Sequence, residues 1–515
     1  MKAVIRATQA QPCQMQYQFE HAIDLDILQG EQIAIVGNNG SGKSILAGML
    51  TGRIPPRGGS LAYDFSPSPF TLISDNIKHI TFRDSYGSYT DSTYYHQQRW
   101  NQIDIDESNT PTVRELLDKA FDTAEHSTAK CFGYKEEDKA AITAERRVLR
   151  EKLFSLFHLD SLLDKYIIML SSGELRKFQL TRTLLSSPRI LVLENPFIGL
   201  DAATRQQLQD LLQALIKEIG LQVILVLSKS DDIPPFITHV VTMDHRRLMG
   251  KDTYSTYQTH IPSIPAHVLT AEKRQAILSL PYTDAPLDSE TTGSDTVVDF
   301  HDVNIRYGDR TILKDLSFTV KKGERWALSG ENGAGKSTLL SIVCADNPQA
   351  YANDITLFGH RRGSGESIWD IKRHIGYVSP EMHRAYQKDV PCVEIVASGL
   401  PNALGLYKKP KAEELPICEF WMDIFGIRRF RDTSFLKLSS GEQRLVILSR
   451  VFVKDPSLLI LDEPLHGLDL MNRRLVKDII ETYCLRRDKT MIMVTHYESE
   501  LPDNITHRIH LKRRS

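Results

Sequence analysis

Two short apolar runs in the chain end in polar residues. Residues 190–193 are followed by Glu194-Asn195-Pro196, and residues 458–461 are followed by Asp462-Glu463-Pro464. Such runs, bounded by polar and turn residues, are typical of strands that are buried on both faces of a parallel sheet. Open α/β sheets bind their ligands at the carboxyl ends of these strands. The pattern therefore predicts an α/β protein with functional polar residues at two strand ends.

Two further strand-like runs, residues 32–36 and 325–329, each lead into a glycine-rich loop and then into a helical pattern. Each loop reads Gly-x-x-x-x-Gly-Lys-Ser, and its glycines let backbone N–H groups converge on phosphate oxygens at the positive end of a helix. We expect the lysine to reach the β- and γ-phosphates and the serine to ligate Mg²⁺. A glycine-rich turn without a ligand is the alternative, but strand, loop and helix occur together twice. The nucleotide-binding residues predicted from the loops are Gly37, Asn38, Asn39, Gly40, Ser41, Gly42, Lys43 and Ser44, and Gly330, Glu331, Asn332, Gly333, Ala334, Gly335, Lys336, Ser337 and Thr338.

The two halves of the chain are duplicated domains. Leu170 and Leu438 are 268 positions apart, and so are Glu194 and Asp462. The two glycine-rich loops are 293 positions apart, so the first half has 25 extra residues upstream of Leu170. We therefore expect the first domain to diverge from the second in that region.

Residues 253–296 separate the repeated halves and have the composition of a connector. The segment contains four prolines and a polar run at 288–294, which is typical of a linker. We expect at most one short helix in it. The predicted domains are residues 1–252 and 297–515.

The composition narrows the possible partners and surroundings. The chain has 63 Lys and Arg residues against 65 Asp and Glu residues, a net charge of −2, so no global charge attracts nucleic acid or an anionic membrane. The six cysteines are scattered, which favours reduced thiols over a disulfide framework, a zinc site or an iron–sulfur cluster. No stretch reaches the roughly 18 apolar residues of a membrane helix, and the N-terminus lacks a signal-peptide pattern. We predict a soluble, cytoplasmic protein that reaches the inner face of a membrane only through a partner.

An aromatic and basic segment at residues 86–100, which contains Arg99 and Trp100, leaves two interpretations open. Such a mixture can stack on nucleic-acid bases, or it can pack locally. The near-neutral charge of the whole chain favours local packing, and it makes nucleic acid the less favoured partner.

Further motifs surround the acidic strand ends in both halves. Leu-Ser-Ser-Gly-Glu precedes them at residues 170–174 and 438–442, and Gly-Leu-Asp follows them at residues 199–201 and 467–469. In this order, the motifs resemble those of the ATP-binding cassette ATPases along both halves. The resemblance implies two P-loop domains of α/β fold, each with a mainly parallel core sheet, a β subdomain and a helical subdomain. It also implies that the protein binds ATP with Mg²⁺ and hydrolyses ATP.

In the resembled family, the Leu-Ser-Gly-Gly-Gln signature of one domain closes over nucleotide that is held by the phosphate loop of the other. The resemblance thus implies a monomer whose two halves pair within one chain to form two composite sites. Both signatures here read Ser-Gly-Glu at the positions of Gly-Gly-Gln, which is a modest departure. The residues assigned by the resemblance are Ser171, Ser172, Gly173, Glu174 and Asp201 in the first half, Ser439, Ser440, Gly441, Glu442 and Asp469 in the second, and Ser44, Glu194, Ser337 and Asp462 as Mg²⁺ ligands.

The two sites are not expected to be equally competent. Hydrolysis needs a group that deprotonates water and a partner that senses the γ-phosphate. In the second half, Glu463 stands at the position of the base, and His496 matches the family's switch histidine. In the first half, Asn195 and Ser228 stand at these positions. Because an amide has no useful basicity, we predict that the site with Asn195 holds ATP and that the site with Glu463 hydrolyses it.

Two other family positions depart from the expected pattern. Tyr307 fits the aromatic residue that stacks on adenine, but the first half offers only Gln14 near that position, with Tyr17 as a substitute. The glutamine that couples Mg²⁺ to the helical subdomain is replaced in the second half, where Glu381 could take its role. This departure weakens the expectation of coupling to a transmembrane partner.

The loop at residues 357–372 resembles that of a tandem cassette protein classed with molybdenum transport; its residues alone show only a basic, glycine-containing loop. We favour an ATPase that supplies or regulates transport, with membrane subunits as partners and molybdate or another oxyanion as the implied cargo. Two alternatives remain. One is a cassette ATPase that acts on the ribosome or on nucleic acid, and the other is a regulatory module switched by ATP occupancy.

Overall fold

The computed structural model describes most of the chain. The described residues are 2–68, 70–82, 111–129, 136–167, 170, 172–197, 200–228, 233–259, 265, 267–280, 295–307, 310–331, 333–380, 382, 386, 389–400, 409–486 and 489–512. The chain divides into two compact units, one holding the described residues up to Thr259 and one holding those from Pro265 onward. This division falls inside the segment that we predicted to be the linker.

The first unit is built on a six-stranded sheet with the strand order β5-β6-β7-β3-β8-β9. Its first five strands are parallel, and β9 pairs antiparallel with β8. A separate antiparallel sheet has the order β2-β1-β4. The strands are β1 (Ala3–Ala10), β2 (Ile23–Leu28), β3 (Ile33–Val36), β4 (Ser60–Tyr63), β5 (Ile77–Thr81), β6 (Ile190–Glu194), β7 (Gln222–Leu227), β8 (His239–Asp244) and β9 (Arg247–Thr253).

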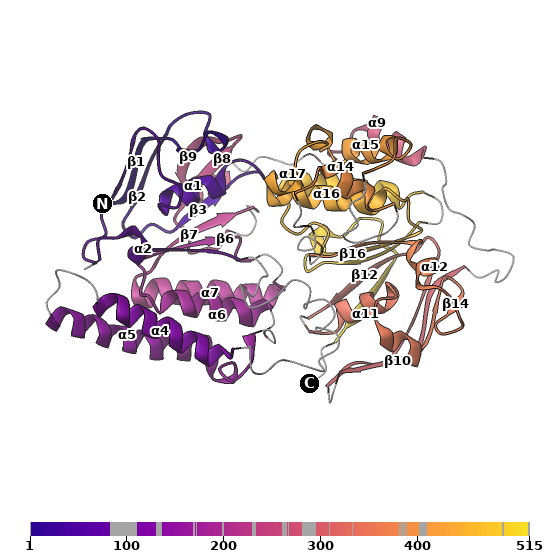
Figure 1. Cartoon of the computed structure of the whole chain (residues 1–515), viewed down its shortest axis with the longest axis horizontal. Coiled ribbons are helices and arrows are strands. Elements are labelled where there is room, and N and C mark those ends of the chain that lie inside the picture. Colours follow the sequence, from indigo (N-terminus) through magenta and orange to yellow (C-terminus); the bar gives the residue numbers. More distant parts are fainter. Residues whose placement is uncertain are drawn as a thin grey trace. The chain divides into compact units, whose positions relative to one another are not determined.

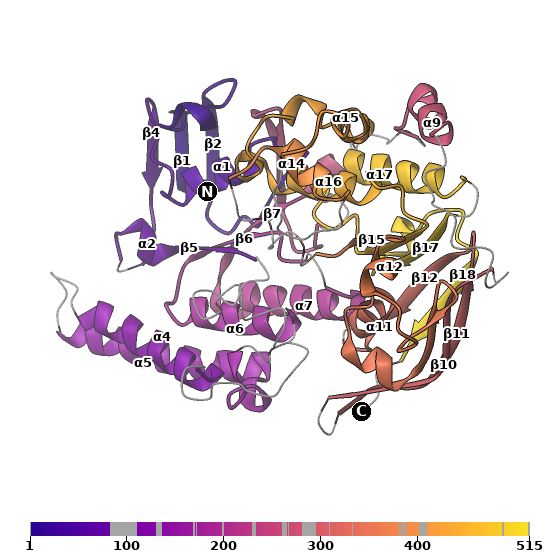
Figure 2. The ribbon, with the colours of Figure 1, turned by 45° about the vertical axis from the view of Figure 1, so that its right-hand side comes forward.

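The second unit repeats this plan with a five-stranded, fully parallel sheet of order β15-β16-β17-β12-β18 (Figure 2). Its antiparallel sheet has the order β11-β10-β13-β14. The strands are β10 (Thr296–Tyr307), β11 (Arg310–Lys321), β12 (Arg325–Gly330), β13 (Asp354–Leu357), β14 (His360–Arg361), β15 (Ile375–Val378), β16 (Leu458–Asp462), β17 (Thr490–Val494) and β18 (His507–Leu511). The predicted α/β fold, with a parallel core sheet and a β subdomain in each half, is confirmed.

The parallel strands β6 and β16 are buried on both faces, as their unbroken apolar sequences predicted. Along β16, Leu459 and Leu461 belong to the hydrophobic cluster on one side of the sheet, and Leu458 and Ile460 belong to the cluster on the other side. The side chains of β6 alternate between two clusters in the same way. Each sheet is therefore the middle layer of its unit, and only its strand ends are open to polar chemistry.

Helices cover both sheets, and the helical regions of the two units differ in size. Figure 1 shows α4 and α5 lying side by side beyond α6 and α7. Helices α4 and α5 have 17 and 22 residues, whereas α14 and α15, at the same place in the second unit, have 6 and 10. The longer helices lie in the region of extra sequence. The helices of the first unit are α1 (Lys43–Leu50), α2 (Ile73–Asn76), α4 (Val113–Ala129), α5 (Glu136–Phe157), α6 (Ser172–Leu184), α7 (Ala202–Ile219) and α8 (Tyr254–Thr259). Those of the second unit are α9 (Ala271–Leu278), α11 (Lys336–Val343), α12 (Ile368–Lys372), α14 (Cys392–Ala397), α15 (Leu415–Ile424), α16 (Ser440–Phe452) and α17 (Leu470–Tyr483), with short 3-10 turns between several elements.

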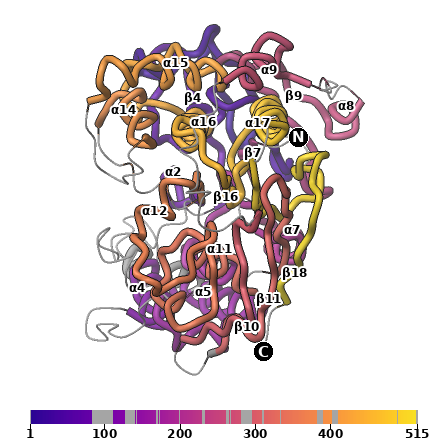
Figure 3. The backbone as a smooth tube through the Cα atoms, turned by 90° about the vertical axis from the view of Figure 1, so that its right-hand side faces the viewer, coloured from indigo at the N-terminus to yellow at the C-terminus, as the bar shows by residue number. Residues whose placement is uncertain are grey.

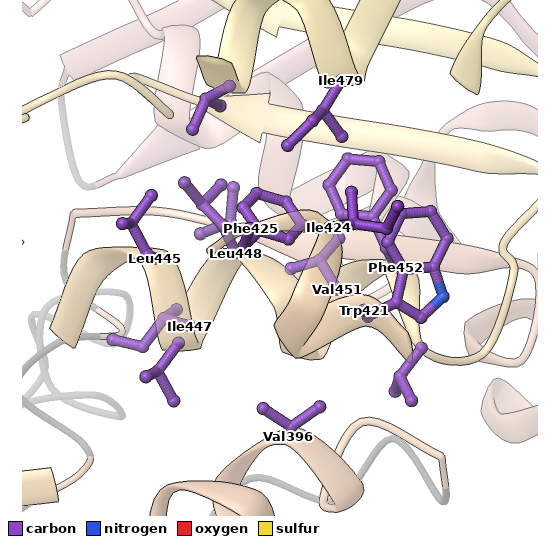
Figure 4. Packing of buried hydrophobic residues seen from close by; sticks show 14 of the residues in the cluster. Val396, Trp421, Ile424, Phe425, Leu445, Ile447, Leu448, Val451, Phe452 and Ile479 are labelled. Atoms are coloured by element: carbon purple, nitrogen blue, oxygen red, sulfur yellow. The ribbon is translucent and has the colours of Figure 1, made fainter. Parts of the chain in front are cut away.

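Aromatic packing holds the helical region of the second unit against its core. Figure 4 shows Trp421 of α15, and Phe425 directly after this helix, beside Phe452 of α16. The ring centroids of Trp421 and Phe452 are 5.1 Å apart, and Phe452 meets Tyr483 of α17 edge to face at 5.0 Å. Edge-to-face and offset pairs are the favoured aromatic geometries. This cluster therefore fixes α16 between α15 and α17, which matters because α16 begins at the signature of this half.

The connector contains two short helices, so our expectation of at most one was wrong. Helix α8 follows β9 directly, and Tyr254 N–H donates to Thr238 O at 2.9 Å. Helix α9 is capped by the Thr270 hydroxyl, which accepts from Lys273 N–H, and it lies beside α17 (Figure 3). Among the described residues, no helix combines the length and the apolar character needed to cross a bilayer.

Candidate active site

Each glycine-rich loop connects the end of a central strand to the first turn of a helix. A Cβ atom at Gly37 would lie 2.0 Å from the carbonyl oxygen of Met243, and one at Gly330 would lie 2.4 Å from that of Leu511. Met243 and Leu511 occupy equivalent positions on the neighbouring strands β8 and β18. Only glycine fits this close approach, so both loops run tightly against the sheet before they enter α1 and α11.

The two loop lysines fold back onto their own loops. The Lys43 ammonium group donates to Gly37 O and Asn38 O, each at 2.7 Å. Lys336 donates to Gly330 O at 2.6 Å and to Glu331 O at 3.0 Å. Each ammonium group therefore lies against two backbone carbonyls of its own loop, next to a helix N-terminus. This is a cradle of positive character that suits phosphate oxygens.

The two residues that we predicted to ligate Mg²⁺ in the first half are in contact. The Ser44 hydroxyl donates to one carboxylate oxygen of Glu194, and the Thr81 hydroxyl donates to the other at 3.3 Å. Burial would raise the pKa of Glu194, but the neighbouring His79 and these hydroxyl groups lower it below its ordinary value. A hydroxyl group beside an ionised carboxylate provides the hard oxygen ligands that Mg²⁺ prefers. In the second half, Asp462 ends β16 as Glu194 ends β6.

His79 was not predicted, although its Nε2 lies 3.6 Å from the Glu194 carboxylate. It comes from the middle of β5, and β5 and β6 pair so that Thr81 is opposite Glu194. No sequence motif marks this histidine. Only the register of the two strands reveals that His79 faces the acidic strand end.

In the second half, the predicted base and switch residue are brought together. His496 Nε2 lies 3.0 Å from Oε1 of Glu463, and the contact is largely buried. A second histidine, His466, reaches the other oxygen, with Nδ1 2.9 Å from Oε2. Burial would raise the pKa of Glu463, but hydrogen bonds from His466 and His496 hold it well below its usual range. The group is therefore an ionised carboxylate at neutral pH.

The matching position in the first half has different chemistry. The Asn195 side-chain oxygen accepts hydrogen bonds from the Ser228 backbone N–H at 3.1 Å and from the Ser228 hydroxyl at 3.0 Å. Asn195 and Ser228 thus lie together, as Glu463 and His496 do. The pair contains no group that is basic near neutral pH.

A buried arginine, also not predicted, donates hydrogen bonds to the backbone around Glu463. Arg444 of α16 donates to Glu463 O at 2.7 Å, to Ser379 O at 2.9 Å and to Pro464 O at 3.3 Å. Burial lowers its pKa to about 10, which leaves it charged at neutral pH. In the first half, Arg176 of α6 donates to Pro196 O at 2.7 Å. These arginines are 268 positions apart, so the repeat itself was the signal that would have revealed them.

The signature of the second half begins α16 as a capping box. The Ser439 hydroxyl accepts from Glu442 N–H, while the Glu442 carboxylate accepts from Ser439 N–H at 2.9 Å. A Ser-x-x-Glu sequence is the ordinary form of this motif. The departure from the family's Gly-Gly-Gln is thus compatible with a well-formed helix start. In the first half, the Glu174 carboxylate accepts from Lys165 at 2.8 Å.

Three other predicted residues have clear structural contacts. Asp201 and Asp469 cap the N-termini of α7 and α17, accepting from Thr204 N–H at 2.7 Å and from Asn472 N–H at 2.8 Å. Tyr307 ends β10, and its hydroxyl group accepts from Asn347 at 2.9 Å. Ser171, Asn332, Glu381 and the aromatic segment at 86–100 lie outside the described residues, so their predicted roles stay predictions.

The comparisons with known proteins agree with the motifs. The model of the ABC transporter family matches residues 21–198 and 313–466. The chain is 35% identical over 487 residues to the ABC transporter ATP-binding protein ModF of Escherichia coli (strain K12), an alignment that covers 94% of this chain and 92% of that protein. It is 28% identical over 499 residues to an uncharacterized ABC transporter ATP-binding protein of Schizosaccharomyces pombe, covering 95% and 94% of the two chains.

Solved structures show that the fold is shared more widely. An archaeal ribosome recycling factor, solved in complex with a ribosomal stalk protein, matches with a TM-score of 0.51 at 18% identity, covering 95% of this chain and 84% of that one. A structure titled RNase-L Inhibitor matches with the same TM-score and identity, covering 96% and 85%. At this level of identity, the likeness concerns the fold alone.

Proposed function

Because the chain belongs to the ABC transporter family and is a tandem ABC ATPase, we propose that its second half carries the groups that hydrolyse ATP and that its first half holds ATP. The observation that most directly supports this proposal is the Glu463 carboxylate, which lies between His466 and His496. At the same strand end in the first half, Asn195 offers only an amide.

In this proposal, Glu463 takes a proton from the attacking water, and His496 contacts the γ-phosphate. Bound ATP with Mg²⁺ would supply the phosphoryl group and the charge neutralisation that phosphoryl transfer requires. Lys336 would leave its loop carbonyls for phosphate oxygens, and Ser337 and Asp462 would hold the metal ion. Lys43, Ser44 and Glu194 would do the same in the first half, where Asn195 can orient a water molecule without deprotonating it.

Steady-state ATP hydrolysis by two single variants tests this assignment. Removal of a general base typically costs on the order of 10² to 10⁴ in rate, so Glu463→Gln should nearly abolish turnover. Asn195→Ala should change turnover little, because the amide is not a base. If Asn195→Ala were as damaging as Glu463→Gln, the assignment of hydrolysis to the second half would be wrong.

We propose further that this ATPase serves transport through membrane subunits. The support is the 35% sequence identity, over 94% of this chain, to a protein named as an ABC transporter ATP-binding protein. Molybdate or a related oxyanion is the cargo class that the sequence resemblance implies. A pull-down from cells with Glu463→Gln, which should trap the ATP-bound state, tests the partner. Recovery of membrane permease subunits supports the proposal, whereas recovery of ribosomes or RNA in their place would contradict it.

A further inference from the structure

His466 is not among the residues that we predicted from the motifs, yet its side chain contacts the residue to which we assign the base. Resting on the function proposed above, we infer that His466 is a positioning residue that holds the Glu463 carboxylate in place through its Nδ1–H. The contact measures 2.9 Å, between Nδ1 of His466 and Oε2 of Glu463. Because an ionised carboxylate only accepts hydrogen bonds, the proton of this contact belongs to the imidazole ring.

His466 is itself rigidly placed. Its backbone N–H donates to Glu463 O at 3.1 Å, which closes a tight turn three residues after the base. Leu465 and Leu468 on either side are almost fully buried. The next element begins at once, where Asp469 caps α17. The ring of His466 is therefore carried by a turn that is anchored on both sides.

The backbone of Glu463 is also fixed, and only its side chain needs a further restraint. Its N–H donates to Val494 O at 2.9 Å, and its carbonyl accepts from Arg444 at 2.7 Å. Neither contact restrains the carboxylate itself. Among the described residues, the hydrogen-bond and ion-pair contacts to the two carboxylate oxygens come from His466 and His496.

The two histidines have different tasks in the proposed mechanism. His496 Nε2 faces Oε1 of Glu463, and the proposed contact of His496 with the γ-phosphate would require that same nitrogen. When His496 turns to phosphate, one of the two restraints on the carboxylate is lost. His466 belongs to the same turn as Glu463, so its contact can persist. His466 then keeps the base aligned during the step in which alignment matters.

The first half provides an internal comparison. The position equivalent to His466 is Ile198, whose side chain cannot donate a hydrogen bond. The residue that it would restrain is Asn195, whose oxygen already accepts from Ser228. A side chain that can donate a hydrogen bond thus occurs at this position only in the second half, where Glu463 provides a carboxylate to accept it.

Two variants separate positioning from folding. His466→Ala removes the donor, and His466→Asn keeps an N–H group near the place of Nδ1. We expect His466→Ala to lower kcat roughly ten- to a hundredfold, with the KM for ATP unchanged, and His466→Asn to recover most of the loss. His301→Ala is the matched control, since the exposed His301 makes a similar 3.1 Å contact with Asp299 on β10. It should leave kcat unchanged.

A measurement on the nucleotide-free protein tests the contact without turnover. In protein labelled with ¹⁵N-histidine, the His466 signal, assigned through its loss in His466→Asn, should show a ring protonated at Nδ1. Glu463→Ala should shift this signal strongly. An unchanged His466 signal in Glu463→Ala would overturn the inference, even if His466→Ala failed to fold.

The outcomes distinguish this inference from the proposed function. If Glu463→Gln kept full turnover, the assignment of the base would fail. If Glu463→Gln were inactive but folded His466→Ala had the kcat of the unaltered protein, or a higher one, the positioning role of His466 would fail while the assignment of the base stood.

Discussion

Asn195 and Glu463 have the same backbone conformation at equivalent strand ends. Both lie in the left-handed region, with φ of 51° and 46°, and their N–H groups donate to Val226 O at 2.8 Å and to Val494 O at 2.9 Å. Non-glycine residues adopt this region rarely, and mainly where the surrounding structure imposes it. The two halves thus present a side chain in the same way, and their chemical difference lies in the side chains themselves.

The first prediction concerns retention of nucleotide by the first half. Its phosphate loop has the same lysine contacts as the second, but Asn195 replaces the base. After many turnovers, quenched protein should contain ATP bound through Lys43. Loss of the charged donor in Lys43→Ala should weaken this binding roughly ten- to a hundredfold.

Chromatography of the nucleotides released from the quenched protein measures how much ATP the protein has retained. Lys336→Ala is the control, because it should stop turnover yet leave the retained ATP. Finding only ADP, or no nucleotide, in the unaltered protein would rule out a holding site.

The second prediction concerns the capping box of the second signature. Ser439→Ala removes the cap of α16 and should lower the free energy of unfolding by about 1 kcal/mol. Glu442→Gln, which introduces the residue typical of the family, should change it by less than about 0.5 kcal/mol, because glutamine also completes a capping box. Urea denaturation followed by tryptophan fluorescence reports on this half, since it contains three of the four tryptophans. Equal losses in both variants would contradict the capping role.

The third prediction concerns a buried ionic cluster behind α16. The Asp455 carboxylate accepts hydrogen bonds from the Arg486 guanidinium at 3.0 Å and from the Tyr483 hydroxyl at 2.9 Å. It also forms an ion pair with the Lys489 ammonium group at 3.1 Å. Burial would raise the pKa of Asp455, but Arg486 and Lys489 hold it below the ordinary value. Asp455→Asn suits the left-handed backbone at this position, with φ of 53°, yet it removes the negative charge that the buried Arg486 and Lys489 contact. It should cost about 3 kcal/mol of the free energy of unfolding.

This contribution has a defined pH dependence. A carboxyl group whose pKa is depressed in the folded state stabilises fully above its unfolded pKa, about 3.9, and loses that contribution as the pH falls through the folded pKa. The difference between the unaltered protein and Asp455→Asn should therefore be equal at pH 7 and pH 5 and should narrow below about pH 4. Denaturation curves at these pH values measure it. A difference that grew on acidification would contradict the assignment.

The sequence allowed the strands and loops of the site to be predicted because their signals are local. The loops around Lys43 and Lys336 and the acidic ends of β6 and β16 follow from short stretches of sequence. His79 could not be found in this way, because its approach to Glu194 depends on how β5 and β6 pair. Arg444 was within reach, since the repeat offset of 268 relates it to Arg176.

The connector was misread for a physical reason. Its prolines and polar run suggested an open chain, but residues 271–278 are mostly good helix formers with a threonine cap before them. Ile277 of this helix is fully buried, and the Asp478 carboxylate accepts the N–H groups of Val268 and Leu269. Tertiary contacts with α17, which local composition does not reveal, make this segment part of the second domain.

The fourth prediction is that the two halves pair within one chain. Each phosphate loop is expected to need the signature of the other half, and both are present in one polypeptide. One chain with Ser171→Arg and Gly173→Glu should be inactive, and so should a chain with Lys336→Ala. An equimolar mixture should stay inactive. Substantial recovery of ATP hydrolysis on mixing would show that sites assemble between chains.

The anchoring of α8 and α9 lowers the entropy cost that we expect for that pairing. Helix α8 is tied to its sheet through Tyr254, and the chain is held again from His267 onward by Asp478. Between these two anchored points the sequence has seven residues, against 44 in the predicted linker. Since the entropy of loop closure grows with the logarithm of length, this shortening lowers the cost of bringing the domains together by about 1.5 kcal/mol. Lengthening these seven residues with glycine and serine should therefore weaken the coupling between domains without altering a single contact inside either one.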